Sequence, residues 1–156
     1  MTLTHDQKAR SFETFQHIHK VQQLLAKVQE ELAKRALYHD QSKLESPEVE
    51  IFSQHTREIA KTVYGTPEYF TGIEKLGPAL EHHYANNSHH PQHHPEGIDG
   101  MNLVDLIEML GDWYASTLRY KDGDIQKSLV INKERFGISD QLVKVLRNTL
   151  ILMEEK

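Results

Sequence analysis

The sequence predicts an all-α fold, a single compact domain of about six helices over residues 1–156. Apolar side chains recur at spacings of three and four residues along most of the chain, which is the period of an amphipathic helix. No segment alternates apolar and polar residues for long enough to predict a strand. A chain of 156 residues also has the usual length of one domain.

The N-terminal part of the chain predicts two helical segments. Thr4 and Gln7 match a capping box, so a first helix can begin there. Its apolar stripe is clearest over residues 18–32, where spacings of three and four alternate. A second helical segment is expected over residues 35–44.

Two Pro-containing start signals predict the next two helices. Residues 46–48 (Ser-Pro-Glu) supply an N-cap, a first-turn proline and a first-turn acid, and the helix that they open is expected to end near Gly65. Residues 66–68 (Thr-Pro-Glu) repeat the same signal. The apolar stripe of this helix continues to His83.

A polar segment and a capping box follow. Residues 86–100 are rich in Asn, Ser, His, Pro and Gly, which is typical of a loop. Asn102 and Asp105 then cap a strongly apolar helix that is expected to reach about Tyr120.

The C-terminal part of the chain predicts two further helices. A turn at residues 122–124 precedes a helix that extends to Phe136 and is closed by Gly137. Ser139 caps the last helix, which has an apolar stripe of its own.

Composition excludes several classes of site and partner. The chain has no cysteine, which excludes disulfides, thiolate zinc sites, Fe–S clusters and a cysteine nucleophile. The net charge of −5 argues against a large nucleic-acid interface but leaves a local phosphate site open. There is no targeting signal and no apolar run near the ~18 residues that a membrane helix needs. We therefore expect a cytoplasmic protein with no membrane partner.

Eleven histidines are the most unusual feature of the composition, and helix geometry sorts some of them. His17 falls within the apolar sector of its helix, whereas His19 lies on nearly the opposite face. His83 continues the apolar stripe of its own helix. Either inward histidine can be a hydrogen-bonded core residue or a metal ligand. Imidazole and carboxylate are the metal ligands available to a chain without cysteine.

The helix that begins after Asn102 has an acidic face opposite its apolar one. Asp105, Glu108 and Asp112 follow one another at spacings of three and four residues. Such a stripe is either a solvated surface or the wall of a metal site, and spacing alone does not separate the two.

The run from His39 to Lys43 (His-Asp-Gln-Ser-Lys) resembles the HD superfamily of metal-dependent phosphohydrolases. That family has a metal histidine about twenty residues before the doublet, and His17 lies 22 residues before His39. Its closing aspartate is matched by Asp112 in the run Asp-Trp-Tyr-Ala-Ser-Thr. The resemblance implies a metal site formed by His17, His39, Asp40 and Asp112, with Lys43 near the substrate phosphate.

A second set of histidines extends this resemblance. His82 and His83 are similar to the paired histidines of HD proteins that hold a second metal. The tract from His83 to Pro91, with the His-Asp-x-Ser-Lys run, resembles an uncharacterised HD-like family of phages and bacteria. His83, His89 and His90 are therefore implied as ligands of a second metal or as donors to the substrate phosphate.

The resemblance implies a metal-dependent phosphohydrolase that acts on a nucleotide or another small phosphate ester. Its cofactor would be a divalent ion (Mn, Co, Ni, Mg, Zn or Fe), and Glu108 would orient or deprotonate the attacking water. Two alternatives remain open: an HD-fold di-iron oxygenase, and a degenerate domain that binds a nucleotide without catalysis. A homo-oligomer in a bacterial cell or a phage-infected host is compatible with each of them.

Overall fold

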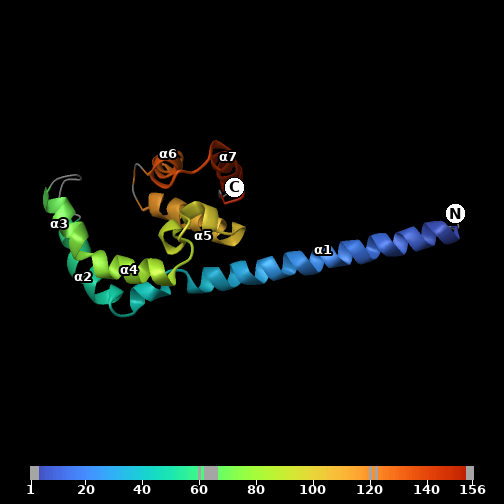
Figure 1. The fold of residues 1–156 in the computed structure, drawn as a ribbon, viewed down its shortest axis with the longest axis horizontal. Coiled ribbons are helices and arrows are strands. Elements are labelled where there is room, and N and C mark those ends of the chain that lie inside the picture. The colour runs from blue at the N-terminus through green and yellow to red at the C-terminus, as the bar shows by residue number, and fades with distance from the viewer. Residues whose placement is uncertain (1–3, 60, 62–66, 120, 122, 154–156) are drawn as a thin grey trace. The chain divides into compact units, whose positions relative to one another are not determined.

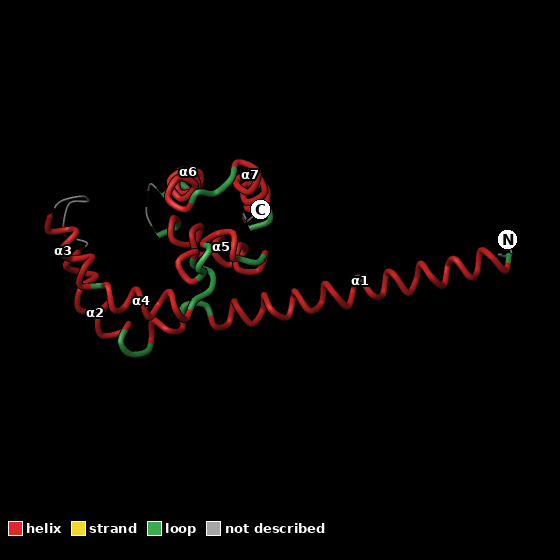
Figure 2. The backbone as a smooth tube through the Cα atoms, viewed as in Figure 1, coloured by secondary structure: helices red, strands yellow, loops and turns green. Residues whose placement is uncertain are grey.

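The computed structural model describes residues 4–59, 61, 67–119, 121 and 123–153, and within them it confirms the all-α fold (Figures 1 and 2). These residues form α-helices and short 3-10 helices without a strand. The α-helices are α1 (His5–Tyr38), α2 (Glu48–Ile59), α3 (Pro67–Lys75), α4 (Gly77–Asn86), α5 (Leu103–Thr117), α6 (Ile125–Phe136) and α7 (Asp140–Leu150). The 3-10 helices are η1 (Gln41–Leu44), η2 (Pro91–His93) and η3 (Gly97–Gly100).

The chain divides into two compact units, Met1–Leu37 and Tyr38–Lys156. The prediction of a single domain is not decided by this division and stays a prediction.

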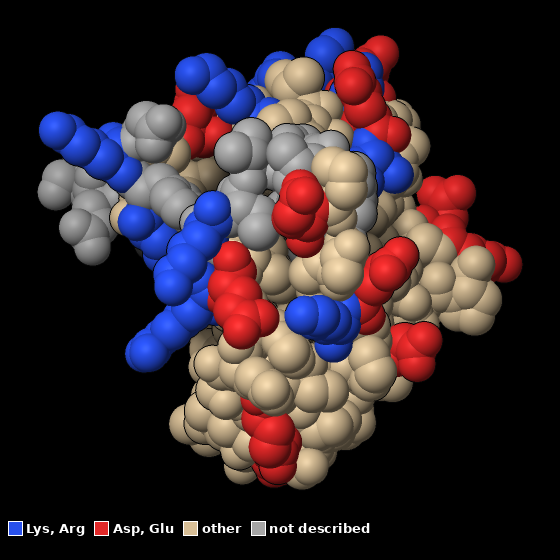
Figure 3. All heavy atoms as spheres, turned by 90° about the vertical axis from the view of Figure 1, so that its left-hand side faces the viewer, with Lys and Arg blue, Asp and Glu red and all other residues tan. Residues whose placement is uncertain are grey.

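Among the described residues, no helix combines the length and the apolar character that crossing a membrane requires. Both signs of charge occur on the face seen in Figure 3, where basic side chains gather toward the left edge and acidic ones are spread over the rest.

Among the described residues, those of the first unit from His5 onward form part of α1, which continues through the first four residues of the second expected segment, while residues 41–44 of that segment form η1. The expected capping box is present, since the Thr4 amide donates to Gln7 Oε1 and the Gln7 amide to Thr4 Oγ1. No residue of α1 is buried, and the apolar stripe, Val21 and Leu25 included, is exposed. A lone helix has no second element against which to bury a face, so this unit contains no core of its own.

Helices α5, α6 and α7 supply the main core of the second unit. Its buried side chains come from all three helices: Leu106, Met109, Leu110, Leu129, Leu146 and Leu150. The predicted caps are confirmed at both ends of this region. Asn102 accepts from the amides of Val104 and Asp105 in a capping box, Ser139 Oγ accepts from the Leu142 amide, and Gly137 ends α6 at φ 65°.

Helices α2, α3 and α4 pack against one another, and their bounds differ from the expectation. One helix was expected from residue 66 to His83, but the structure has two, with a break after Lys75. Pro78 lies in the first turn of α4, where its missing N–H costs nothing, and a helix start is therefore favoured there. Residues 65, 66 and 120, on which three expected helix boundaries fell, lie outside the described residues.

Candidate metal centre

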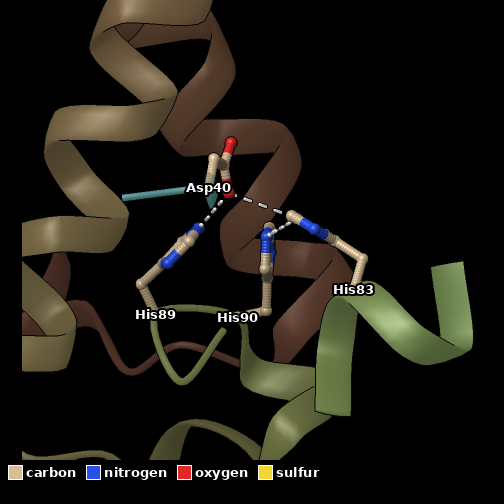
Figure 4. Close-up of side chains that lie close together, drawn as sticks. All are labelled: Asp40, His83, His89 and His90. Carbon is tan, nitrogen blue, oxygen red and sulfur yellow. Dashed lines mark hydrogen bonds and ion pairs between the residues drawn. The ribbon is translucent and has the colours of Figure 1, made fainter. Parts of the chain in front are cut away.

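Four side chains of the second unit point toward one another beside α4 (Figure 4). Asp40 follows α1, His83 lies on α4, and His89 and His90 lie in the loop before η2. Asp40 Oδ1 is 3.4 Å from His83 Nε2 and 3.6 Å from His89 Nε2, and His83 Nε2 is 2.8 Å from His90 Nε2. One ligand atom from each residue lies within 4.8 Å of the others, so a single ion can contact all four.

Two further groups of metal-ligating atoms overlap with this one. His39, Asp40 and Asp112 form the second group, and His39, His89 and Glu108 form the third. Asp40 belongs to two of the three groups, with Oδ1 facing His83 and His89 and Oδ2 lying 3.4 Å from His39 Nε2. A carboxylate with one oxygen toward each group is suited to bridging two cations.

Two buried polar atoms at the centre of the site lack a hydrogen-bond partner among the described residues. They are Asp40 Oδ1 and His89 Nε2, which lie 3.6 Å apart. A buried polar atom without a partner costs about 1–3 kcal/mol, and more when it is charged. Both atoms are lone-pair donors of the kind that divalent ions accept, so a cation between them would remove this cost.

Glu108 of α5 holds two of the imidazole rings. Its Oε1 lies 2.9 Å from His39 Nδ1 and 3.1 Å from His89 Nδ1. A carboxylate oxygen only accepts hydrogen bonds, so His39 Nδ1 donates to it, and His89 Nδ1 lies within ion-pair distance of the same oxygen. The Nε2 atom of each ring then faces Asp40.

Glu48, the first residue of α2, is fully buried and does the same for two other rings. Its Oε1 accepts from His82 Nδ1 at 2.7 Å, and its Oε2 accepts from His83 Nδ1 at 2.9 Å. The side-chain Nδ2 of Asn87 donates to Ser42 Oγ and to the His83 carbonyl oxygen, which completes the hydrogen-bond network around the His83 ring. With its proton on Nδ1, neutral His83 has its lone pair on Nε2, which faces His90 Nε2 and Asp40 Oδ1.

The pKa shifts give several of these side chains the protonation state that a metal ligand needs. Burial, with the neighbouring His89 and His83, lowers the pKa of His90 to about 3, and burial also lowers the pKa of His83. Burial by itself raises the pKa of Asp40, but the hydrogen bond and charge of Lys43 outweigh it and leave that pKa below its usual value. Neutral imidazole and ionised carboxylate are the forms that bind metals.

His39 is the exception, because it lies among carboxylates. Hydrogen bonding to Asp112 and to Glu108 raises the pKa of His39 to about 10. In turn, the pKa of Asp112 is lowered: burial raises it, but the hydrogen bond with His39 and the charges of His89, His39 and Lys43 outweigh burial. The negative charge that keeps a proton on His39 also favours a divalent cation in its place.

The structure brings together most of the residues that the sequence singled out. His39, Asp40 and Asp112 share one group, and the second histidine set, His83, His89 and His90, converges on the same aspartate. Lys43 donates to Asp40 Oδ2 at 2.6 Å, which places its ammonium group at the edge of the site. Glu108 contacts His39 and His89, and its expected role toward a water molecule stays a prediction.

His17 lies on α1 in the first unit, where its side chain is exposed. Its expected role as a metal ligand stays a prediction.

The acidic stripe of α5 turns inward rather than toward solvent. Asp105 is buried and accepts from Ser88 Oγ, and the side chains of Glu108 and Asp112 are 10% and 27% exposed.

Sequence reasoning missed the role of Glu48. Its position after Ser-Pro is that of an ordinary first-turn acid, and this local signal concealed its contacts with side chains 34 and 35 residues further along. His82, which the resemblance pairs with His83, is its second partner. The remaining loop histidines bind backbone carbonyls: His93 donates to Tyr84 O and His94 to Ser88 O.

An open pocket of about 640 Å³ adjoins the metal-ligating atoms. It shares His83 and His90 with the four-residue group, and Lys43 also lines it. The pocket therefore gives a small molecule direct access to the side of the site where those two imidazoles lie.

The fold and this cluster define an all-helical protein with a candidate metal centre of imidazoles and carboxylates. The chain belongs to a family of unknown function, DUF5662, whose model matches residues 6–152. No curated protein and no solved structure matches the chain.

Proposed function

We propose that the protein is a metal-dependent phosphohydrolase that acts on a nucleotide or another small phosphate ester. The observation that carries this proposal is the pair of buried atoms without a hydrogen-bond partner among the described residues, Asp40 Oδ1 and His89 Nε2, within a group of four convergent candidate ligands. The residues fit a divalent ion, because imidazole and carboxylate together suit Mn, Fe, Co, Ni and Zn.

Asp40, His83, His89 and His90 would hold one ion, and His39, Asp40 and Asp112 a second. When bound, a divalent ion lowers the pKa of a coordinated water molecule and neutralises charge on a phosphoryl group. Glu48 and Glu108 keep the imidazoles in one tautomer and orientation.

The surroundings of the ligand group favour a phosphate substrate. Lys43 places an ammonium group beside Asp40, and Arg119 lines the adjoining pocket. Lysine binds phosphate as a point charge, and arginine can bind two phosphate oxygens at once. The two cations therefore complement the double negative charge of a phosphate monoester.

Metal content and phosphate release test the proposal together. The protein, purified without a histidine tag, should contain stoichiometric divalent metal and release phosphate from a panel of nucleotides and simple phosphate esters. The double variant His39→Ala/Asp40→Ala should lose both properties, whereas His55→Ala, which removes a histidine of α2 that pairs with Glu58, should keep both. Equal metal content and activity in the double variant would refute the site.

The shared Asp40 also supports a second candidate, a di-iron oxygenase. Two overlapping ligand groups with a common carboxylate are suited to a pair of metal ions. Iron at two equivalents per chain, with substrate-dependent uptake of O₂ and no phosphate release, would favour this alternative.

A further inference from the structure

The pocket beside the metal-ligating atoms has a strongly apolar wall. Val49 and Phe52 of α2 line it together with Leu76, Leu80 and Tyr84 from the region of α4. Among the described lining residues, the other polar ones are Ser53, Thr56 and Tyr84. A ligand that fills this space would gain most of its binding energy from burying apolar surface.

Aromatic rings connect this wall to the imidazoles. The Phe52 ring meets His83 edge to face, with centroids 6.4 Å apart, and the Tyr84 ring meets His90 in the same manner at 5.2 Å. His83 and His90 of the four-residue group thus line the pocket, and the apolar wall lies beside them.

The charges along the pocket have one sign. Lys43 and Arg119 both line it, and none of the residues that the structure describes in its lining is a carboxylate. An anionic group is favoured near the cations, whereas a second charge against Phe52 and Leu80 would lose its hydration without a partner. The pocket therefore suits a molecule with an anionic end and an uncharged apolar remainder.

We propose that the substrate is a phosphate monoester whose organic group is uncharged and apolar or aromatic, with that group held against Phe52, Leu80 and Tyr84. This inference rests on the proposed function. In the reaction, water adds to phosphorus and the ester P–O bond breaks. The alcohol leaves with a proton from the water, and inorganic phosphate is the second product. Selectivity then depends on the apolar area of the alcohol rather than on hydrogen bonds to it.

Binding of non-hydrolysable phosphonates tests the pocket independently of catalysis. Calorimetry on the metal-loaded protein should give an affinity for 2-phenylethylphosphonate about tenfold higher than for ethylphosphonate, because only the former reaches the apolar wall. Phe52→Ala should reduce this preference about tenfold. Leu103→Ala, an equally apolar truncation at an exposed position of α5, should leave the preference intact. Equal affinities for the two phosphonates, or no binding of either, would overturn the inference.

Hydrolysis of the matching esters separates this inference from the proposed function. Ethyl phosphate and 2-phenylethyl phosphate have alcohol leaving groups of similar acidity, so kcat/KM should differ through binding in the pocket. A preference of about tenfold for the phenylethyl ester supports the inference, and equal kcat/KM values contradict it. Selective phosphonate binding without hydrolysis of any ester would refute the phosphohydrolase and retain the apolar binding pocket.

Discussion

Two glutamates hold the imidazole rings by the nitrogen that faces away from the centre of the site. Glu108 accepts from His39 and lies within ion-pair distance of His89, and Glu48 accepts from His82 and His83, in every case at Nδ1. In metal sites such carboxylate–imidazole pairs fix the tautomer and raise the basicity of the ligand nitrogen. The ligand atoms are therefore oriented by residues that do not themselves belong to the four-residue group.

Replacing Glu48 with glutamine tests this role at the level of one atom. In Glu48→Gln, an NH₂ group takes the place of one carboxylate oxygen, so the side chain can no longer accept from both imidazoles. We expect a 10- to 100-fold loss of affinity for Zn²⁺ or Co²⁺, measured by calorimetry. Glu50→Gln, at an exposed position of the same helix, should bind like the unmodified protein. An unchanged affinity in Glu48→Gln would contradict a positioning role, and circular dichroism would verify that the variant is folded.

At the scale of the element, α5 joins the core to the candidate metal centre. One face of the helix contributes Leu106, Met109 and Leu110 to the core, and the other presents Glu108 and Asp112 to the imidazoles. Its start is defined by the capping box of Asn102 and Asp105, which satisfies amides that the helix itself leaves without partners.

Removal of the cap should therefore destabilise the fold. Asn102→Ala deletes the oxygen that accepts from the amides of Val104 and Asp105, and we expect a loss of about 1 kcal/mol in the free energy of unfolding. Urea denaturation measures this loss. Asn102→Ser restores a capping oxygen and should recover most of the stability. If alanine and serine gave the same midpoint as asparagine, the cap would contribute nothing to stability.

At the scale of the whole molecule, the metal-ligating residues come from distant parts of the sequence. Asp40 follows α1, His83 lies on α4, His89 and His90 lie in the next loop, and Asp112 lies on α5. A bound ion would join these segments of the second unit to one another. Because the unfolded chain does not hold these atoms together, binding stabilises the folded state.

Metal should accordingly raise the thermal unfolding temperature. At a free concentration one hundred times the Kd, one ion adds about 2.7 kcal/mol, which is a shift of several degrees for a protein of this size. Differential scanning fluorimetry with Mn²⁺ or Zn²⁺, and with EDTA as the reference, measures this shift. Asp40→Ala should abolish it, whereas His55→Ala should retain it. A shift of equal size in Asp40→Ala would mean that the ion binds elsewhere.

The fold was readable from the sequence wherever the signal is local. The caps at Thr4, Asn102 and Ser139 and the closing glycine Gly137 all lie where the pattern predicted them, because a cap depends on residues within about four positions. The break between α3 and α4 was missed because an apolar stripe continues across it.

The sequence by itself determined the all-helical fold. It also determined which ligand types a metal site could use. A chain without cysteine, with His39 next to Asp40 and several histidines before α5, has imidazole and carboxylate to offer. Only the tertiary structure decided which of these side chains meet. The partners of Glu48 and Glu108 are 19 to 69 residues away along the chain, and packing rather than periodicity brings them together. Spacing along a helix specifies a face, whereas contact between helices is set by how the whole core closes.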